Sequence, residues 1–412
     1  MQTLLSREFT NTHEGREAEA ILRKCVHCGF CNATCPTYQV LGDELDGPRG
    51  RIYLIKQMLE GAEVTGSTQL HLDRCLTCRS CETTCPSGVE YGHLLDIGRK
   101  LVDERVSRPL ARRAERWLLK EGLTSALFAP ALAAARRLRR WLPTRVRAKI
   151  PAPRPDATPA VSRAHARKVL LFEGCVQPAM IPNIDAATVR VLDAAGIQAI
   201  SSRVAGCCGA LRTHLSDPSG GLGDMRRNID AWWPLIATGA VECIVVNASG
   251  CSHMIKEYAH ALRHDAQYAA KAARISALTR DVCELLPELT AALAARMRPA
   301  PRPLAFHAPC TLQHGQRLRG VDGALRALGF DVRLPGDSHL CCGSAGAYSL
   351  LQPALADELR DRKLGNIAAL EPACIVSANI GCIQHLQSGT ATPVRHWIEV
   401  LDAALEPESA AL

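Results

Sequence analysis

Eight cysteines in the first 90 residues stand in two strings of the same spacing. Each string reads C-x2-C-x2-C-x3-C-P, the spacing by which thiolates hold [4Fe–4S] clusters. Three cysteines at intervals of three, on a tight loop, can reach three corners of one cubane. A cubane passes one electron at a time, so two strings predict a protein that conducts electrons. The cysteines are Cys25, Cys28, Cys31 and Cys35, then Cys75, Cys78, Cys81 and Cys85.

The fourth cysteine of each string precedes a proline, which ends the loop and turns the chain away. In two-cluster ferredoxins this fourth cysteine ligates the other cluster. We therefore assign Cys25, Cys28, Cys31 and Cys85 to one cluster, and Cys75, Cys78, Cys81 and Cys35 to the other. Zinc and disulfides are the alternatives, but zinc sites usually use two CxxC pairs rather than two quartets ending in Cys-Pro.

The composition predicts a multi-domain protein with aliphatic cores. The chain has 412 residues, of which 47% are hydrophobic and only 4% aromatic. The first 20 residues carry several charges and no apolar stretch typical of a signal peptide. The nineteen cysteines are therefore expected in a reducing compartment, where metal binding prevails over disulfides. No apolar run is long enough to predict a membrane span.

The elements around the two strings predict a helical cluster domain over residues 1–105. Residues 50–61 place apolar side chains on one face of a helix, and a second helix is expected over 91–106. Residues 106–166 form a basic helical segment followed by a Pro-rich linker with Pro151, Pro153, Pro155 and Pro159.

The basic segment is densest between Arg136 and Lys149, where Trp141 and leucines are interleaved. Such a helix can lie on an anionic membrane surface or contact an acidic partner. A solvated helix face is the simpler interpretation, since charge runs are usually just that. Nucleic acid is not expected as a partner, because no nucleic-acid-recognition motif accompanies the basic residues.

The remaining residues form a second internal repeat. The stretch 168–172 leads into Cys175 as 303–307 leads into Cys310, and 241–251 aligns without a gap with 372–382. Strands alternating with helices, at 184–195 and 321–328, predict two α/β units over 167–300 and 301–412. The fold class is thus α+β and multi-domain: a helical two-cluster ferredoxin domain followed by two tandem α/β cysteine-rich (CCG) repeats.

Each unit presents four cysteines on three loops at strand ends. Two of them are adjacent and followed by a glycine, which we interpret as letting backbone approach a bound group. The eight form a candidate third redox centre, with apolar packing as the alternative. They are Cys175, Cys207, Cys208 and Cys251, then Cys310, Cys341, Cys342 and Cys382.

Other chemical side chains in this half are interpreted as structural. Cys243 and Cys374 are expected mid-strand among Ile and Val, and Cys283 in a core. Four histidines lie near the repeat cysteines, and hydrogen-bonded structural roles are preferred over ligand or proton-carrier roles. They are His253, His307, His339 and His385.

With both motif sets in hand, the chain resembles iron–sulfur subunits of bacterial glycolate oxidase over nearly its full length. The most specific stretches are 25–38, 42–52 and 75–89. The CCG repeats also resemble those of glycerol-3-phosphate dehydrogenase, lactate-oxidising systems and heterodisulfide reductase. In the last family the repeat ends CxxC and holds a five-cysteine cluster. Here Met254 and His385 stand at that position, which leaves an ordinary cluster or none.

The resemblance implies an electron-transfer subunit of a glycolate dehydrogenase complex. It implies a flavin-binding partner subunit and a quinone or other acceptor, with the chain cytoplasmic and peripheral on the inner membrane face. No flavin or nicotinamide site is expected here: the one glycine cluster, 220–223, reads as a loop rather than a dinucleotide fingerprint. The alternatives are a lactate or glycerol-3-phosphate complex, and a disulfide- or quinone-reducing enzyme with its active site in the repeats. An iron–sulfur regulator that binds nucleic acid ranks last.

Overall fold

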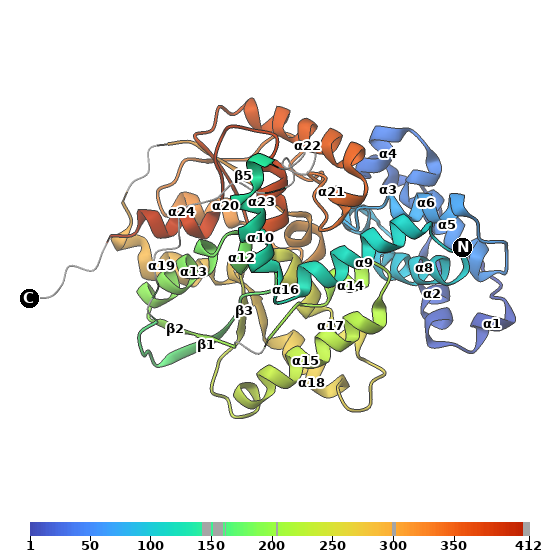
Figure 1. Cartoon of the computed structure of the whole chain (residues 1–412), viewed down its shortest axis with the longest axis horizontal. Helices are drawn as coiled ribbons and strands as arrows, with labels where there is room; N and C mark the ends of the chain where they lie inside the picture. Colours follow the sequence, from blue (N-terminus) through green and yellow to red (C-terminus); the bar gives the residue numbers. More distant parts are fainter. Residues whose placement is uncertain (142–149, 151–159, 161, 203–204, 299–301, 407–412) are drawn as a thin grey trace, which may run out of the picture.

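The computed structural model describes the chain except for residues 142–149, 151–159, 161, 203–204, 299–301 and 407–412. A helical domain at the N-terminus packs against two α/β units (Figure 1). The predicted fold class is confirmed. The dense part of the predicted basic stretch beyond Trp141, and the Pro-rich linker, lie almost entirely outside the described residues.

The N-terminal domain is a set of helices around an aliphatic core. Its longer helices are amphipathic and bury Ile55, Met58, Leu94 and Leu95 against one another. The helices predicted over 50–61 and 91–106 are confirmed. The long helices are α2 (His13–Lys24), α5 (Pro48–Leu59), α6 (Gly66–Asp73) and α8 (Tyr91–Arg105), and the short ones are α1 (Arg7–Thr10), α3 (Phe30–Ala33), α4 (Pro36–Leu41) and α7 (Ser80–Thr84).

Two helices connect this domain to the repeats. α9 (Leu110–Thr124) and α10 (Phe128–Arg137) are bent by 103° to one another. Among the described residues, no single helix meets the length and hydropathy criteria for crossing a membrane, and this bent pair meets them only when taken together.

The first repeat is a parallel four-stranded sheet in the order β2-β1-β3-β4. Its central strands β1 and β3 are short and mostly apolar, as expected for strands covered on both faces. Helices α13 and α19 pack with one core cluster, and α15, α16 and α18 with another. The elements are β1 (Arg167–Phe172), α12 (Gln177–Met180), α13 (Asn183–Ala194), β2 (Ile197–Ser201), α14 (Ala210–His214), α15 (Pro218–Ala237), β3 (Ile244–Val246), α16 (Ser249–Lys256), α17 (Tyr258–Ala261), α18 (Ala269–Leu278), β4 (Thr279–Asp281) and α19 (Leu286–Leu293).

The second repeat has the same topology, with the order β6-β5-β7-β8. The two repeats share a continuous core, and the Ser249 amide donates to the Ala378 carbonyl at 3.0 Å across their junction. The helices predicted over 184–195 and 321–328 are confirmed. The elements are β5 (Leu304–His307), α20 (Val321–Ala327), β6 (Val332–Arg333), α21 (Tyr348–Leu351), α22 (Pro353–Ala368), β7 (Cys374–Ser377), α23 (Ile380–Gln387), β8 (Val394–His396) and α24 (Trp397–Ala404).

The glycine cluster predicted as a loop is instead the first turn of α15, so that prediction is wrong. Pro218 occupies the first turn, and the Asp217 side chain caps the helix by accepting from the Gly220 amide at 3.0 Å. Gly221 is small because a Cβ there would lie 2.5 Å from Thr213 Oγ1. Gly221 thus serves helix packing.

Two structural cysteines also lie elsewhere than expected. Cys243 lies immediately before β3 rather than within it, and Cys374 is the first residue of β7. Both are half-buried at the sheet ends, whereas Cys283 is buried as expected. Cys243 and Cys374 thus lie at the amino ends of their strands, away from the cysteines of the repeats, and Cys283 follows β4 in the core.

Candidate iron–sulfur sites

The first cysteine set surrounds a cavity of about 450 Å³. Cys25 follows the last residue of α2, and the next residues turn sharply with positive φ at His27 (56°) and Gly29 (83°). This left-handed backbone, costly for a residue other than glycine, aims successive thiols at one point. Burial raises the pKa of Cys31 to about 11, and the neighbouring thiols of Cys25, Cys28 and Cys85 add to the effect.

The second set repeats this arrangement around a cavity of about 300 Å³. Thr77 and Arg79 take positive φ at the places that correspond to His27 and Gly29. Burial raises the pKa of Cys81, and its thiol neighbours contribute in the same direction. Those neighbours are Cys78, Cys75 and Cys35.

The structure therefore brings each fourth cysteine to the set of the other string. Cys85 lines the first cavity, and Cys35 lines the second. Each proline after them, Pro86 and Pro36, lines the same cavity as its cysteine. The four assigned cysteines of each set line its cavity, and Cys81 of the second set also lines the first cavity. Four thiolates are the donor set that a [4Fe–4S] cluster requires, so the residues present fit two clusters.

Sequence reasoning missed a buried cation beside the second set. Arg51 is 1% exposed, lines the second cavity and pairs with Asp46 at 3.3 Å. It also donates to the His71 carbonyl at 2.7 Å. Burial alone would lower the pKa of Arg51. The nearby acidic groups, of which Cys75 has the largest effect, raise this pKa above its ordinary value. Arg51 thus offsets negative charge at this set.

Polar donors also distinguish the second set from the first. The Tyr91 hydroxyl donates to Cys75 Sγ at 3.6 Å, and the Thr77 amide to the same sulfur at 3.5 Å. Thr37 Oγ1 lies 3.3 Å from Cys35 Sγ. Charge and hydrogen bonds to sulfur tune the reduction potential of a cluster. The surroundings of the second set favour its reduced state.

The two sets differ in their access to solvent. Cys28 of the first set is exposed, and Val26 and Phe30 beside it are 68% and 62% exposed. In the second set, Cys78 is hydrogen-bonded to Cys310 of the second repeat. The first set therefore faces outward, and the second faces the repeats.

The four cysteines of the first repeat gather at the carboxyl ends of β1, β2 and β3. Hydrogen bonds connect the thiols in the order Cys175, Cys207, Cys208, Cys251. The hydrogen bonds with Cys175 and Cys208 lower the pKa of Cys207. Phe172, Trp232 and Tyr258 pack around them in an apolar cluster.

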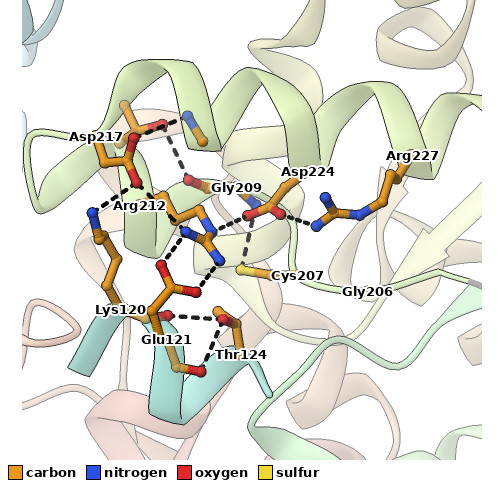
Figure 2. A network of polar contacts seen from close by, with 12 residues as sticks. Lys120, Glu121, Thr124, Gly206, Cys207, Gly209, Arg212, Asp217, Asp224 and Arg227 are labelled. Carbon is orange, nitrogen blue, oxygen red and sulfur yellow. Dashed lines mark hydrogen bonds and ion pairs between the residues drawn. The ribbon is translucent and has the colours of Figure 1, made fainter. Parts of the chain in front are cut away.

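An ion-pair network joins this set to α9 (Figure 2). Arg212 donates two hydrogen bonds to the Glu121 carboxylate of α9, at 2.6 and 2.7 Å, and also pairs with Asp224 beside Cys207. Lys120 of α9 contacts Asp217 at 2.8 Å. Part of the basic segment therefore contacts the repeats rather than solvent.

The four cysteines of the second repeat gather at the corresponding strand ends. Cys310 is hydrogen-bonded to Cys341, Cys341 to Cys342, and Cys342 to Cys382. The buried amine of Lys363 donates to the Asp337 carbonyl at 2.5 Å. Burial lowers the pKa of Lys363, and the nearby thiols oppose this effect.

The glycine after each cysteine pair is also constrained by packing. Gly209 and Gly343 have φ of 93° and 88°, and a Cβ on Gly343 would lie 2.4 Å from the Ala356 carbonyl oxygen. The close approach is thus to the following helix. Each glycine amide also donates at 3.4 Å to the sulfur two residues earlier, Cys207 or Cys341.

The four candidate histidines separate in the structure. His339 is exposed, and His385 Nε2 bonds to the Ala356 carbonyl at 3.0 Å. His253 packs beside Gly315, where burial lowers its pKa to about 3. Only His307 among these four lies with metal-ligating side chains in the described part of the chain, together with Cys342 and Cys382.

Comparison with known protein families agrees with the division into an N-terminal domain and two repeats. Residues 21–89 match the 4Fe-4S dicluster domain family, and residues 169–256 and 304–387 each match the cysteine-rich domain family. The protein is therefore a dicluster iron–sulfur protein that carries two cysteine-rich domains.

Curated relatives narrow the class. The chain is 54% identical to the glycolate oxidase iron–sulfur subunit of Escherichia coli (strain K12), over 99% of this chain and 100% of the relative. It is 29% identical to a probable glycolate oxidase iron–sulfur subunit of Bacillus subtilis (strain 168), over 93% and 92%. Lactate utilization protein A of Geobacillus kaustophilus is 29% identical over 57% of this chain and 99% of its own length. The chain belongs to the family of glycolate oxidase iron–sulfur subunits.

Proposed function

We propose that this chain is the electron-transfer subunit of a glycolate-oxidising complex, with the eight ferredoxin cysteines in the crossed assignment as ligands of two [4Fe–4S] clusters. When bound, each cluster accepts and releases one electron. Glycolate oxidation removes two electrons, so we place this chemistry on a flavin of a partner subunit. The names of the relatives that match over nearly their full length support glycolate as the substrate of the complex.

The observation that carries the proposal is the serial placement of the two cysteine sets. The first set opens to solvent at Cys28, where Val26 and Phe30 offer an apolar surface to a partner. The second set is covered by the second repeat at Cys310. Arg51 and Tyr91 stabilise negative charge at the second set. The chain thus directs electrons inward from the exposed set.

We further propose that the acceptor is a membrane quinone and that the chain lies peripherally on the cytoplasmic face of the membrane. The support is the outer surface of α9 and of the residues that flank α10, where large apolar side chains are exposed beside arginines. Trp117 is 61% exposed, Leu118 63%, Leu127 73% and Trp141 75%. Exposed Trp and Leu with neighbouring arginines are typical of helices that lie in a membrane interface.

The test is reduction of the protein by the substrate of its complex. The complex is purified anaerobically, and electron paramagnetic resonance (EPR) spectra are recorded after glycolate, lactate or glycerol 3-phosphate is added. We expect cubane signals with glycolate and none with the other two. Cubane signals with lactate but not with glycolate would show that the chain belongs to a lactate-oxidising complex. A chain that reduces a quinone or disulfide without partner subunits would overturn the proposal.

A further inference from the structure

The two cysteine-rich repeats differ at one position that faces their thiols. β1 and β5 each end three residues before the first cysteine of their repeat, at Phe172 and His307 respectively. Phe172 packs edge-on against Trp232, with ring centroids 5.5 Å apart. At this position the first repeat therefore places an aromatic hydrocarbon ring, whereas the second places an imidazole.

The His307 imidazole lies beside cysteines of the second repeat. It is 2% exposed, and its Nδ1 lies 3.1 Å from Ser377 Oγ. That bond fixes the ring, as a second-sphere partner does for a metal-ligating histidine. Its Nε2 is buried and has no hydrogen-bond partner within the described residues. A buried ring nitrogen without a partner is costly unless something binds it.

The His307 side chain lies within a candidate ligand set. The ligand atoms of His307, Cys342 and Cys382 all lie within 4.8 Å of one another, and all three side chains are buried. Cys341 and Cys310 continue the set, and the Gly343 amide and the Asn379 amide each donate to one of its sulfurs. Thiolates with an imidazole suit the iron of iron–sulfur centres and zinc.

We propose that the second repeat holds an iron–sulfur centre in which His307 Nε2 is a ligand beside the thiolates of Cys342 and Cys382, and that the first repeat holds none. Iron is favoured over zinc because Cys310 of this set contacts Cys78, a residue of the second ferredoxin set. This choice of metal rests on the proposed electron-transfer function, while the ligand assignment rests on the repeat alone. The buried cation of Lys363 lies near Cys310, Cys341 and Cys342 and offsets thiolate charge.

Substitutions that exchange the two repeats test the asymmetry. The full chain is purified anaerobically as wild type, His307→Phe, which copies Phe172, and Cys342→Ser. Cys208→Ser in the first repeat and His385→Gln are the matched controls. We expect about twelve iron in the wild type and both controls, and about eight in His307→Phe and Cys342→Ser, on four iron per cubane. About eight in the wild type, equal iron in all five proteins, or zinc in place of the extra iron would overturn the proposal.

A conservative variant separates ligation from folding. Pulsed EPR of the reduced wild type should show a nitrogen hyperfine coupling on the third centre. In His307→Cys we expect the iron to remain while that coupling disappears. Retention of the coupling would refute His307 as the ligand. The two ferredoxin cubane signals should persist in every variant, and they report separately on the two-cluster part of the proposed function.

Discussion

The Cys78 thiol of the N-terminal domain is hydrogen-bonded to the Cys310 thiol of the second repeat. The two residues are far apart in sequence, yet the contact places a ferredoxin cysteine directly against a cysteine set of the α/β units. Tyr348 strengthens the same junction, because its hydroxyl donates to the Arg74 carbonyl at 3.1 Å. The two domains thus meet where their sulfur atoms meet, which is the arrangement that an electron path requires.

Crossed ligation makes a prediction about distant cysteines. Cys28→Ser and Cys78→Ser serve as reference proteins that lack the first and the second cluster, respectively. The EPR spectrum of Cys35→Ser should match that of Cys78→Ser, and that of Cys85→Ser should match Cys28→Ser, because each fourth cysteine lines the other cavity. Each variant should lose about four iron. The opposite matching would show that each string binds its own cluster.

The potential of the second cluster should depend on Tyr91. Its hydroxyl donates to Cys75 Sγ, and such bonds stabilise the more negative, reduced cluster. Tyr91→Phe removes about 1 kcal/mol of this stabilisation, which for one electron lowers the potential by about 40 mV. A redox titration followed by EPR measures it.

Tyr53→Phe is the matched control, because Tyr53 is 44% exposed on α5. Its potentials should equal those of the wild type. A shift confined to the first cluster in Tyr91→Phe would contradict the assignment of Cys75 to the second.

The contact between the N-terminal domain and the first repeat should depend on pH. His93 Nε2 lies 2.7 Å from Glu257 Oε2, and the His93 and His260 rings stack at 3.8 Å. Burial alone would lower the pKa of His93, but the Glu257 carboxylate raises it above its ordinary value. A raised pKa in the folded state stabilises the protein at low pH and loses this effect as pH rises through that pKa.

We therefore expect thermal stability to fall between about pH 6.5, the ordinary value for histidine, and the raised pKa of His93. His93→Gln should be less stable than the wild type by about 1 to 3 kcal/mol below this range, and the two should converge above it. Unfolding followed by circular dichroism across pH measures the difference. A constant difference at all pH values would contradict the ion-pair explanation.

The two cysteine strings and the repeat could be found from the sequence, because they depend on residue spacing alone. The crossed assignment follows from the pattern of two-cluster ferredoxins, and the structure places Cys85 and Cys35 at the corresponding cavities. The sequence could not single out Arg51: one arginine in an amphipathic helix resembles a surface residue until α5 is packed. The four histidines were equivalent in sequence for the same reason. Only the parallel sheet, by placing the end of β5 beside Cys342 and Cys382, distinguishes His307.

The glycine cluster shows the opposite error. Residues 220–223 read as a loop because glycine is a poor helix former. The structure places them in α15, because the Asp217 cap and Pro218 start the helix and Thr213 leaves no space for a side chain at Gly221. Capping and close packing outweighed propensity. Asp217 followed by Pro218 is a helix-start signal in the sequence, whereas the close packing at Gly221 depends on the neighbouring helix.

The outer surface of α9 should bind membranes through its apolar side chains. Trp117→Gln with Leu118→Gln removes two side chains that are 61% and 63% exposed, so the fold should not change. Losing their insertion costs roughly 2 kcal/mol, which is about a 30-fold loss of affinity. Co-sedimentation with vesicles of anionic phospholipid measures it.

Leu70→Gln is the matched control, because Leu70 is also exposed (43%) but lies on α6. It should sediment as the wild type does. Arg112→Gln with Arg113→Gln should weaken binding to anionic vesicles but not to neutral ones, since these exposed arginines act through charge. Equal sedimentation of the Trp117/Leu118 variant and the wild type would contradict membrane binding through α9. The apolar face of α9 would then be explained by contact with a partner subunit.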